Sequence, residues 1–329
     1  MIKRILLTVV FSLLIIGGFL VYQLDTIHNE PINIDTDLYE VEAGVGFNRL
    51  CNDWQKRGYI RSCLKYQIYS KFLPRQFQLK AGVYELRGLR VLEAIAKIHR
   101  GEQKQFAFTI IAGETFDDVF RKLAKSPYLT VPEDKQQLQT ALKMDTSPEG
   151  WFLPETYHYE AYSNAASLLM RANLKMQKVL AQAWQQRVSQ LPLESPYQAL
   201  ILASIIEKET GYAPERNTIA SVFVNRLNKK MRLQTDPTVI YGLGETFDGD
   251  IKRSHLKQYT PYNTYRIKGL PPTPIAMPSA DAIYAATQPA ETPFYYFVSK
   301  GDGQHQFSKS LREHNQAVQK YILKRNNDS

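Results

Sequence analysis

An uncharged apolar run close to the N-terminus is the feature that most constrains this chain. Residues 5–21 read ILLTVVFSLLIIGGFLV, and Thr8 and Ser12 are the only hydroxyl residues among them. With a rise of about 1.5 Å per residue, such a helix is about 25 Å long, at the short end of what spans a bilayer. We therefore expect a transmembrane anchor over residues 5–22.

The charges around this run predict its orientation. Lys3 and Arg4 precede it, and the next charged residue is Asp25. The positive-inside rule then makes residues 1–4 a cytoplasmic tip and places the rest of the chain, after a stalk over residues 23–34, outside the cytoplasm. A cleaved signal peptide is the alternative, but the apolar run is long for one and no A-x-A site follows it. The sequence thus predicts a single-pass membrane protein whose body lies outside the cytoplasm.

Composition narrows the classes of protein that the exported part can belong to. A length of 329 residues suggests about two domains, and 44% hydrophobic with 22% charged residues excludes wholesale disorder. The net charge of +9 permits a polyanionic partner, but an exported body without a concentrated basic run argues against nucleic acid. Cys51 and Cys63 either form a disulfide, which an extracytoplasmic compartment allows, or pack as two buried thiols.

Hydrophobic periodicity and helix-stop signals predict an α+β fold with two parts. The first, over residues 35–112, is a small module of short elements: helices at 47–56, 61–72 and 91–99, and strands at 39–42, 83–86 and 106–110. The second, over residues 113–329, is mostly helical: helices at 117–125, 164–188, 197–209, 217–227 and 310–323, and a strand at 294–298. Loops rich in Pro, Gly and Tyr lie between its last helices.

Several catalytic and binding motifs are missing from the sequence. It has no G-x-G-x-x-G opening a helix, no Walker A motif, no H-E-x-x-H and no G-x-S-x-G, and its six His residues lack metal-ligand spacing. We therefore expect no cofactor and no metal. Carboxylates remain as the groups that could carry chemistry.

Two glutamates stand where an apolar helix stops, in the segment ASIIEKETG. Glu207 and Glu209 are two residues apart, about 200° on a helix, so at most one of them points into a given site. Both helix faces are apolar, and periodicity favours Glu209 only weakly. We expect Gly211 to end the helix, so that the helix dipole and the apolar setting would raise the carboxyl pKa, as a general acid needs. Two solvated glutamates paired with nearby cations are the alternative.

Three further segments have the composition of a sugar-binding site. They read WFLPETY, MRLQTDPT and YTPYNTYRIKGLPPTP, and they combine aromatic rings with amide and carboxylate groups. Aromatic faces suit the apolar faces of pyranose rings, and the polar side chains suit their hydroxyls. The candidates for sugar contacts are Glu155, Gln234, Asp236, Tyr262 and Asn263, although each segment could equally be a well-packed loop.

Together these segments resemble one family. EGWFLPETY, ASIIEKET, SVFVNRL, MRLQTDPTVIYG, YTPYNTYRIKGLPP and the late YYFV occur in the order found in the YceG-like endolytic murein transglycosylases. The match runs from about Glu40 to the last helix and is strongest from Trp151 to Pro274. The chain departs from the family pattern at Lys230, where Gly is frequent, and at residues 277–279, where N-P-G is frequent.

The resemblance implies a membrane-anchored lyase. It would cut nascent peptidoglycan strands between N-acetylmuramic acid and N-acetylglucosamine, leave a 1,6-anhydro end, and work beside peptidoglycan synthases. The family's catalytic glutamate corresponds to Glu209, and residues 35–112 correspond to a LysM-like, glycan-binding module. A non-catalytic peptidoglycan-binding scaffold and a hydrolytic muramidase are the alternatives.

Overall fold

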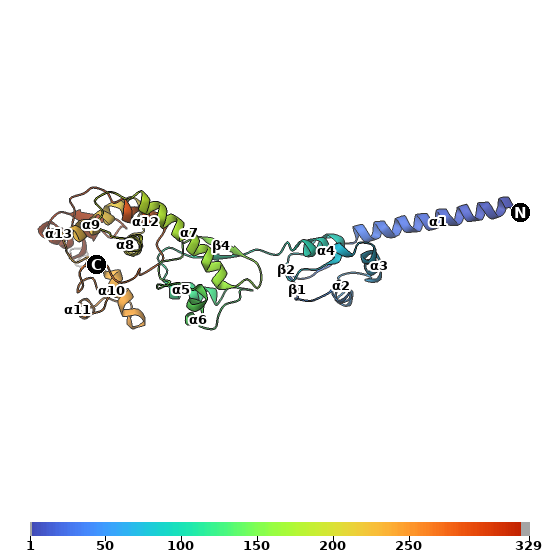
Figure 1. The fold of residues 1–329 in the computed structure, drawn as a ribbon, viewed down its shortest axis with the longest axis horizontal. Coiled ribbons are helices and arrows are strands. Elements are labelled where there is room, and N and C mark those ends of the chain that lie inside the picture. The colour runs from blue at the N-terminus through green and yellow to red at the C-terminus, as the bar shows by residue number, and fades with distance from the viewer. Residues whose placement is uncertain (1, 324–329) are drawn as a thin grey trace. The chain divides into compact units, whose positions relative to one another are not determined.

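The structure is a computed structural model that describes residues 2–323, and the chain divides into two compact units (Figure 1). Residues up to Phe106, together with His158–Ser163, make the first unit. Ala107–Tyr157 and the residues from Asn164 onward make the second. Each of the paired strands β3 (Phe106–Thr109) and β4 (Thr156–Tyr159) contains residues of both units.

The first unit begins with a long helix and continues with short elements. They are α1 (Ile2–Asn29), β1 (Tyr39–Val41), α2 (Phe47–Lys56), α3 (Leu64–Phe72), the 3-10 helix η1 (Pro74–Phe77), β2 (Gly82–Tyr84) and α4 (Val91–Arg100). Strands β1 and β2 are antiparallel, with Tyr39 opposite Tyr84, and helices α2 and α3 connect them along the chain. Gly101 ends α4 in the left-handed conformation, with φ of 74°, as the stop signal predicts.

Aromatic side chains and a disulfide stabilise this small unit. Trp54, Tyr66 and Tyr84 are fully buried in its core. Cys51 and Cys63 are joined by a disulfide, which decides between the two alternatives for these residues. A unit of this size buries a modest core, so a cross-link that restricts its unfolded state is useful to it.

The segment expected to be a stalk is structured. Helix α1 continues through Asn29, and the side chains of Ile27, Ile32 and Ile34 lie in the core of the first unit. The backbone N–H of Ile32 donates to the carbonyl of Leu89 at 3.0 Å. The polar residues between these isoleucines suggested a linker, but the apolar ones give the segment a face to bury. Farther toward the N-terminus, the described side chains of α1 are exposed and apolar enough for a membrane span.

The second unit is mainly helical. Its elements after β3 and apart from β4 are α5 (Phe116–Leu123), α6 (Lys135–Leu142), α7 (Ala165–Gln185), α8 (Pro196–Glu209), η2 (Ala213–Glu215), α9 (Arg216–Asn228), α10 (Asp236–Leu243), η3 (Gly244–Thr246), α11 (Arg253–Lys257), α12 (Ala280–Thr287), β5 (Tyr296–Ser299), β6 (His305–Ser308), α13 (Leu311–Val318) and the π-helical turn η4 (Gln319–Leu323). Strands β5 and β6 form an antiparallel hairpin.

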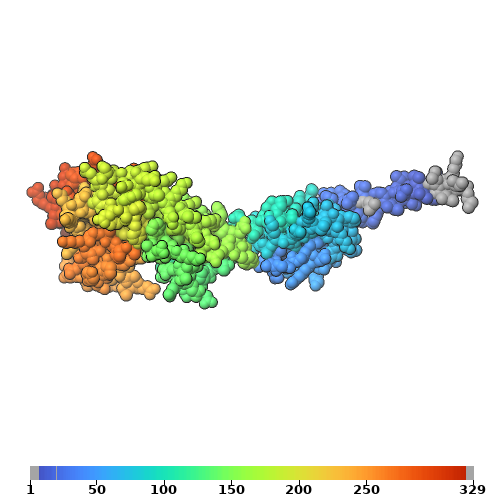
Figure 2. All heavy atoms as spheres, in the orientation of Figure 1, coloured from blue at the N-terminus to red at the C-terminus, as the bar shows by residue number. Residues whose placement is uncertain are grey.

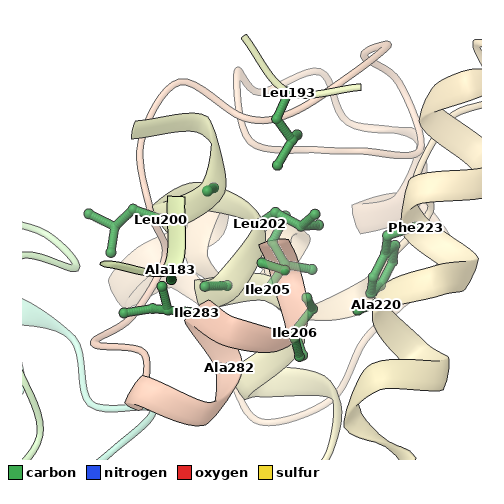
Figure 3. Close-up of a cluster of buried hydrophobic side chains, with 14 of the residues drawn as sticks. Ala183, Leu193, Leu200, Leu202, Ile205, Ile206, Ala220, Phe223, Ala282 and Ile283 are labelled. Atoms are coloured by element: carbon green, nitrogen blue, oxygen red, sulfur yellow. The ribbon is translucent and has the colours of Figure 1, made fainter. Parts of the chain in front are cut away.

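Helix α8 lies at the centre of the second unit and packs against α7, α9, α10 and α12. Its residues Leu202, Ile205 and Ile206 lie in the core beside Phe223 of α9 and Ile283 of α12 (Figure 3). Alanines on both α8 and α12 keep the side chains between these two helices small, which lets them approach closely. The buried helix thus holds its last residue, Glu209, on a rigid support.

The expected mixture of helices with small sheets is confirmed, but one local prediction is wrong. Residues 231–238 were expected to be non-helical, yet Asp236 begins α10, with Pro237 in its first turn. An acidic residue and a proline at these positions both favour a helix start. The helices α6, α11 and α12 and the strands β4 and β6 also lie outside the ranges expected from the sequence.

Candidate active site

Glu209 is the last residue of α8. Ser195 begins the helix by accepting a hydrogen bond from the N–H of Gln198, and Pro196 occupies its first turn. The helix ends at Glu209, as its expected range predicts, but Thr210, rather than Gly211, is the residue that leaves the helical conformation and is extended. The glutamate therefore stands where a buried helix meets irregular backbone.

Glu209 is half-buried, and its carboxyl makes one hydrogen bond. Thr235 Oγ1 donates to its Oε1, and within residues 2–323 its Oε2 has no hydrogen-bond partner. Burial raises the pKa of Glu209 to about 7, the Thr235 hydrogen bond opposes this shift, the nearby Asp236 carboxylate adds to it and Arg226 opposes it. A carboxyl with these properties is available as a proton donor near neutral pH.

The neighbouring residues of α8 point to other segments. Glu207 Oε2 accepts hydrogen bonds from the hydroxyl and, at 3.0 Å, the N–H of Ser279, the residue that caps α12. Lys208 Nζ donates to the carbonyl of Gly113 at 3.2 Å. Of the two candidate glutamates, Glu207 is therefore committed to holding the start of α12, while Glu209 faces Thr235.

Arg226 of α9 fixes the segment that carries Thr235. Its guanidinium donates to the carbonyls of Tyr295, Arg232 and Leu233 at 2.6, 3.1 and 2.9 Å. It also donates to Oε1 of Gln234 at 3.3 Å, and Gln234 is held in the left-handed region with φ of 52°. These contacts hold a strained turn in place, and the next residue along is the one that binds Glu209.

Asp236 lies at the start of α10, next to Thr235. Its side chain is exposed, and the hydroxyl of Tyr265 donates to its Oδ1 at 2.7 Å. The buried setting of Tyr265 and this carboxylate both raise the tyrosine pKa. Gln234 is exposed as well. The structure therefore brings two of the predicted sugar-contact residues, Gln234 and Asp236, to the neighbourhood of Glu209.

Asn263 and Tyr262 are held inside their loop. The Asn263 amide nitrogen donates to the carbonyls of three residues, His255, Leu256 and Gln258, and its oxygen accepts from the N–H of Tyr265 at 3.0 Å. This buried side chain is fully used by the backbone, which favours a role in shaping the loop. Tyr262 is half-buried, and a hydrogen bond of 2.9 Å joins its hydroxyl to that of Thr273.

Glu155 lies apart from this group. It is exposed just before β4 and forms an ion pair with Lys175 of α7. In the part of the chain that the structure describes, no hydrogen bond links Glu155 to the residues around Glu209. Its surroundings therefore favour a surface ion pair.

Glu149 is buried in the second unit and was not among the candidates predicted from the sequence. Its side chain is 4% exposed, Oε1 accepts from the N–H of Phe116 at 3.0 Å, and Oε2 accepts from the hydroxyl of Tyr241 at 3.0 Å. Burial raises its pKa to about 7. In the sequence, Glu149 opens the EGWFLPETY motif, two residues before Trp151, and that position does not distinguish a buried carboxyl from a surface one.

The fold and the site define a class: α+β proteins with a half-buried glutamate at the end of a buried helix, and without a metal-binding cluster among the residues that the structure describes. Comparison with known proteins identifies the family within this class. Residues 39–320 match the model of the YceG-like family, and the chain belongs to that family.

The relatives give the same assignment. Over 95% of its length the chain is 31% identical to the endolytic murein transglycosylase of Bacillus subtilis, and the match covers 92% of that protein. The endolytic murein transglycosylase of Streptococcus pneumoniae is 24% identical, with 95% of the chain and 64% of the relative covered. A crystal structure of a YceG-like protein from Listeria monocytogenes superposes with a TM-score of 0.55 and 28% identity, covering 85% of the chain and 98% of that structure.

Proposed function

We propose that the protein is an endolytic peptidoglycan lytic transglycosylase with Glu209 as its catalytic residue. Two relatives that span 95% of the chain are named for this activity. The observation that carries the assignment of Glu209 is its geometry: a half-buried residue at the end of α8 whose carboxyl has a pKa raised to about 7 and, within residues 2–323, one oxygen without a hydrogen-bond partner. We infer that this oxygen is the one that meets the substrate.

In the proposed first step, protonated Glu209 gives its proton to the glycosidic oxygen between N-acetylmuramic acid and N-acetylglucosamine as the C1–O bond breaks. In the second step, the resulting carboxylate accepts the proton of the muramic C6 hydroxyl while that oxygen bonds to C1. The glutamate ends as it began, and the product carries a 1,6-anhydro ring. One carboxyl suffices because no water has to be activated, unlike in most glycosidases.

Two residues near Glu209 can stabilise the charges that appear during these steps. Thr235 donates to Glu209 Oε1 and so stabilises the carboxylate that exists between the steps. The exposed carboxylate of Asp236, at the start of α10, can stabilise the positive charge that develops on the sugar ring. With Glu155 paired to Lys175, Asp236 is the better candidate for that role, and Gln234 beside it is a candidate for a sugar hydroxyl.

The remaining features fit an enzyme attached to the inner membrane. We assign α1 as a single-pass anchor with its N-terminus in the cytoplasm and both units outside, where the Cys51–Cys63 disulfide is stable. The order β1, α2, α3, β2 supports a LysM-like, glycan-binding module over residues 35–112, ahead of a catalytic domain over 113–329. Peptidoglycan synthases are the proposed neighbours at that membrane.

The test is product analysis with purified, uncross-linked glycan strands. Wild-type protein should release fragments with anhydromuramic ends, detected by mass spectrometry. Glu209→Gln should release no detectable amount in the same time, and Glu207→Gln, at a residue that contacts the α12 cap, should keep the activity. Reducing muramic ends would indicate a hydrolytic muramidase, and binding without new ends would indicate a scaffold. Activity that survives in Glu209→Gln and is lost in folded Glu207→Gln would reverse the assignment of the acid.

A further inference from the structure

Helix α3 exposes an apolar stripe that an independent unit would be expected to bury. Leu64, Ile68 and Phe72 are spaced by four residues along this nine-residue helix, and they are 65%, 49% and 78% exposed. Residues at this spacing share one face of a helix. The opposite side of the helix supplies Tyr66 to the core. A contiguous exposed apolar face on an amphipathic helix marks a contact surface.

Polar contacts attach α3 to the end of α1. Tyr66 donates to Oε2 of Glu30 at 2.6 Å, and Lys65 forms an ion pair with the same oxygen at 2.7 Å. The rings of His28 and Tyr69 meet edge to face, with centroids 6.0 Å apart. Glu30 directly follows the last residue of α1. Helix α3 is therefore fixed at the point where the apolar helix enters the first unit (Figure 1).

The apolar face of α3 and the apolar helix line one open groove. The groove has a volume of about 1160 Å³, and its walls include Phe19 and Tyr22 from α1 and Leu64, Ile68 and Phe72 from α3. In Figure 2, α1 extends from the first unit with its visible face uncovered by other segments. The stripe on α3 is thus continuous with the surface of α1 that would contact lipid.

Three cations lie near this face along the chain: Arg61 lines the groove, Lys71 precedes Phe72 in α3, and Arg75 follows in η1. Arg61, Lys71 and Arg75 are exposed, and none of them forms an ion pair within residues 2–323. Asp25 is the acidic residue of the groove wall that lacks a cationic partner in the same range. An apolar helix face edged by Lys and Arg is the pattern of helices that lie in the plane of a membrane surface containing anionic lipid.

We propose that α3 is a second membrane contact, lying in the bilayer interface with Leu64, Ile68 and Phe72 among the upper acyl chains. Arg61, Lys71 and Arg75 then meet anionic headgroups. This rests on the proposed assignment of α1 as a membrane anchor. The occupant of the groove is lipid, because anything that fills a groove walled by the end of a membrane span lies at the depth of the bilayer surface. Two attachments fix the tilt of the first unit, which one helix would leave free.

The experiment measures the depth of α3 in full-length protein reconstituted into vesicles that contain phosphatidylglycerol. A nitroxide on Ile68→Cys is compared with one on Glu102→Cys, after labelling without reductant so that the Cys51–Cys63 disulfide remains. Helix α4 begins at Val91, whose N–H donates to the carbonyl of Glu30, and its ten residues extend for about 15 Å. Glu102 follows the far end of this helix, away from Glu30. For each label, the collision rate with oxygen is divided by the collision rate with a water-soluble nickel chelate. This ratio should be several-fold higher at position 68 than at position 102.

The proposal is overturned if both labels are equally open to the nickel chelate while the protein floats with the vesicles. It is also overturned if the label at 68 is shielded from both oxygen and nickel, because that indicates a protein partner or a second copy of the chain. A wild-type protein that does not float contradicts the anchor itself. Arg61→Gln with Lys71→Gln and Arg75→Gln should reduce the depth signal, most clearly in vesicles containing phosphatidylglycerol, without releasing the protein.

Discussion

Two carboxyl groups in the second unit share a pKa of about 7 but differ in their surroundings. Glu149 is sealed, and donors from Phe116 and Tyr241 occupy both of its oxygens. Glu209 has the same pKa, yet it is partly exposed and shares one oxygen with Thr235. Burial is the main cause of the raised pKa in both cases. A shifted pKa therefore marks both a structural and a candidate catalytic group, and access to substrate separates them.

The buried carboxyl of Glu149 connects two helices of the second unit. Glu149 joins the start of α5 to Tyr241 of α10, and the ring of Tyr241 lies 4.8 Å from that of Tyr262. Helix α10 begins at Asp236, beside Glu209. Glu149 thus supports the helix whose other end forms part of the candidate site, and we regard it as a positioning residue.

The largest expected effect is on the rate. Glu209→Gln removes the proton donor and should lower the rate of anhydro-end formation by about 10²–10⁴-fold, the usual contribution of general acid catalysis. Glu149→Gln keeps an acceptor for Phe116 and should lower the rate by no more than about tenfold, the cost of one weakened hydrogen bond. Single-turnover assays at pH 6 measure both. Equal losses in two folded variants would contradict the distinction drawn between these residues.

The pH profile separates the two groups further. Because the protonated form of Glu209 is the donor, kcat/KM should fall as pH rises through about 7, by about tenfold per pH unit above it. Glu149 titrates in the same range, so wild type alone cannot assign the fall. The Glu149→Gln variant should keep the fall in kcat/KM above pH 7. Loss of the pH dependence in that variant would show that Glu149 controls the rate.

Thr235 provides a smaller and directional test. Its hydroxyl favours the carboxylate of Glu209, so Thr235→Val should raise the pKa of Glu209 and move the fall in kcat/KM upward by about one pH unit. Thr235→Ser keeps the donor and serves as the control. A profile that moves to lower pH in Thr235→Val would mean that this hydroxyl does not stabilise the carboxylate.

The smallest effect concerns stability. Since burial raises the pKa of Glu149 above its unfolded value, the group favours folding below pH 4.5, and this contribution is lost as pH rises through about 7. Gln does not titrate. Relative to Glu149→Gln, wild type should therefore lose about 1 kcal/mol of unfolding free energy between pH 6 and pH 8. Urea unfolding at the two pH values measures this, and an unchanged difference between the proteins would argue against a buried, titrating carboxyl.

Local patterns in the sequence predicted much of the helical structure. The ranges expected for α2 and α4 agree with the structure within a residue, because glycines bracket the first and Gly101 ends the second. The short α12 was missed, since its start depends on a capping serine held by Glu207, a contact distant in sequence. The packing of Ile32 and Ile34 likewise depends on partners that local patterns do not reveal.

For the candidate site, the sequence pattern favoured Glu209 over Glu207 only weakly. The other predicted site residues have different surroundings in the structure. Helical spacing places the two glutamates on different faces, and which face meets a loop is set by the tertiary fold. Asn263 and Asp236 looked equivalent as polar loop residues. The backbone occupies the amide of the first, whereas the carboxylate of the second is exposed beside Glu209, and only tertiary structure decides such differences.

The last turn of α8 gives three consecutive side chains three separate destinations: Ser279 for Glu207, the carbonyl of Gly113 for Lys208, and Thr235 for Glu209. Successive residues of a helix are rotated by about 100°. Deleting a single residue upstream in α8 would consequently shift each of these side chains by one position, so that Glu209 would point toward the partner of Lys208 and Thr210 would take the place of the carboxyl in the candidate site. The length of this helix is therefore under as strict a constraint as the identity of its final residue, and libraries that vary it should yield far fewer working proteins than libraries that vary the surrounding loops.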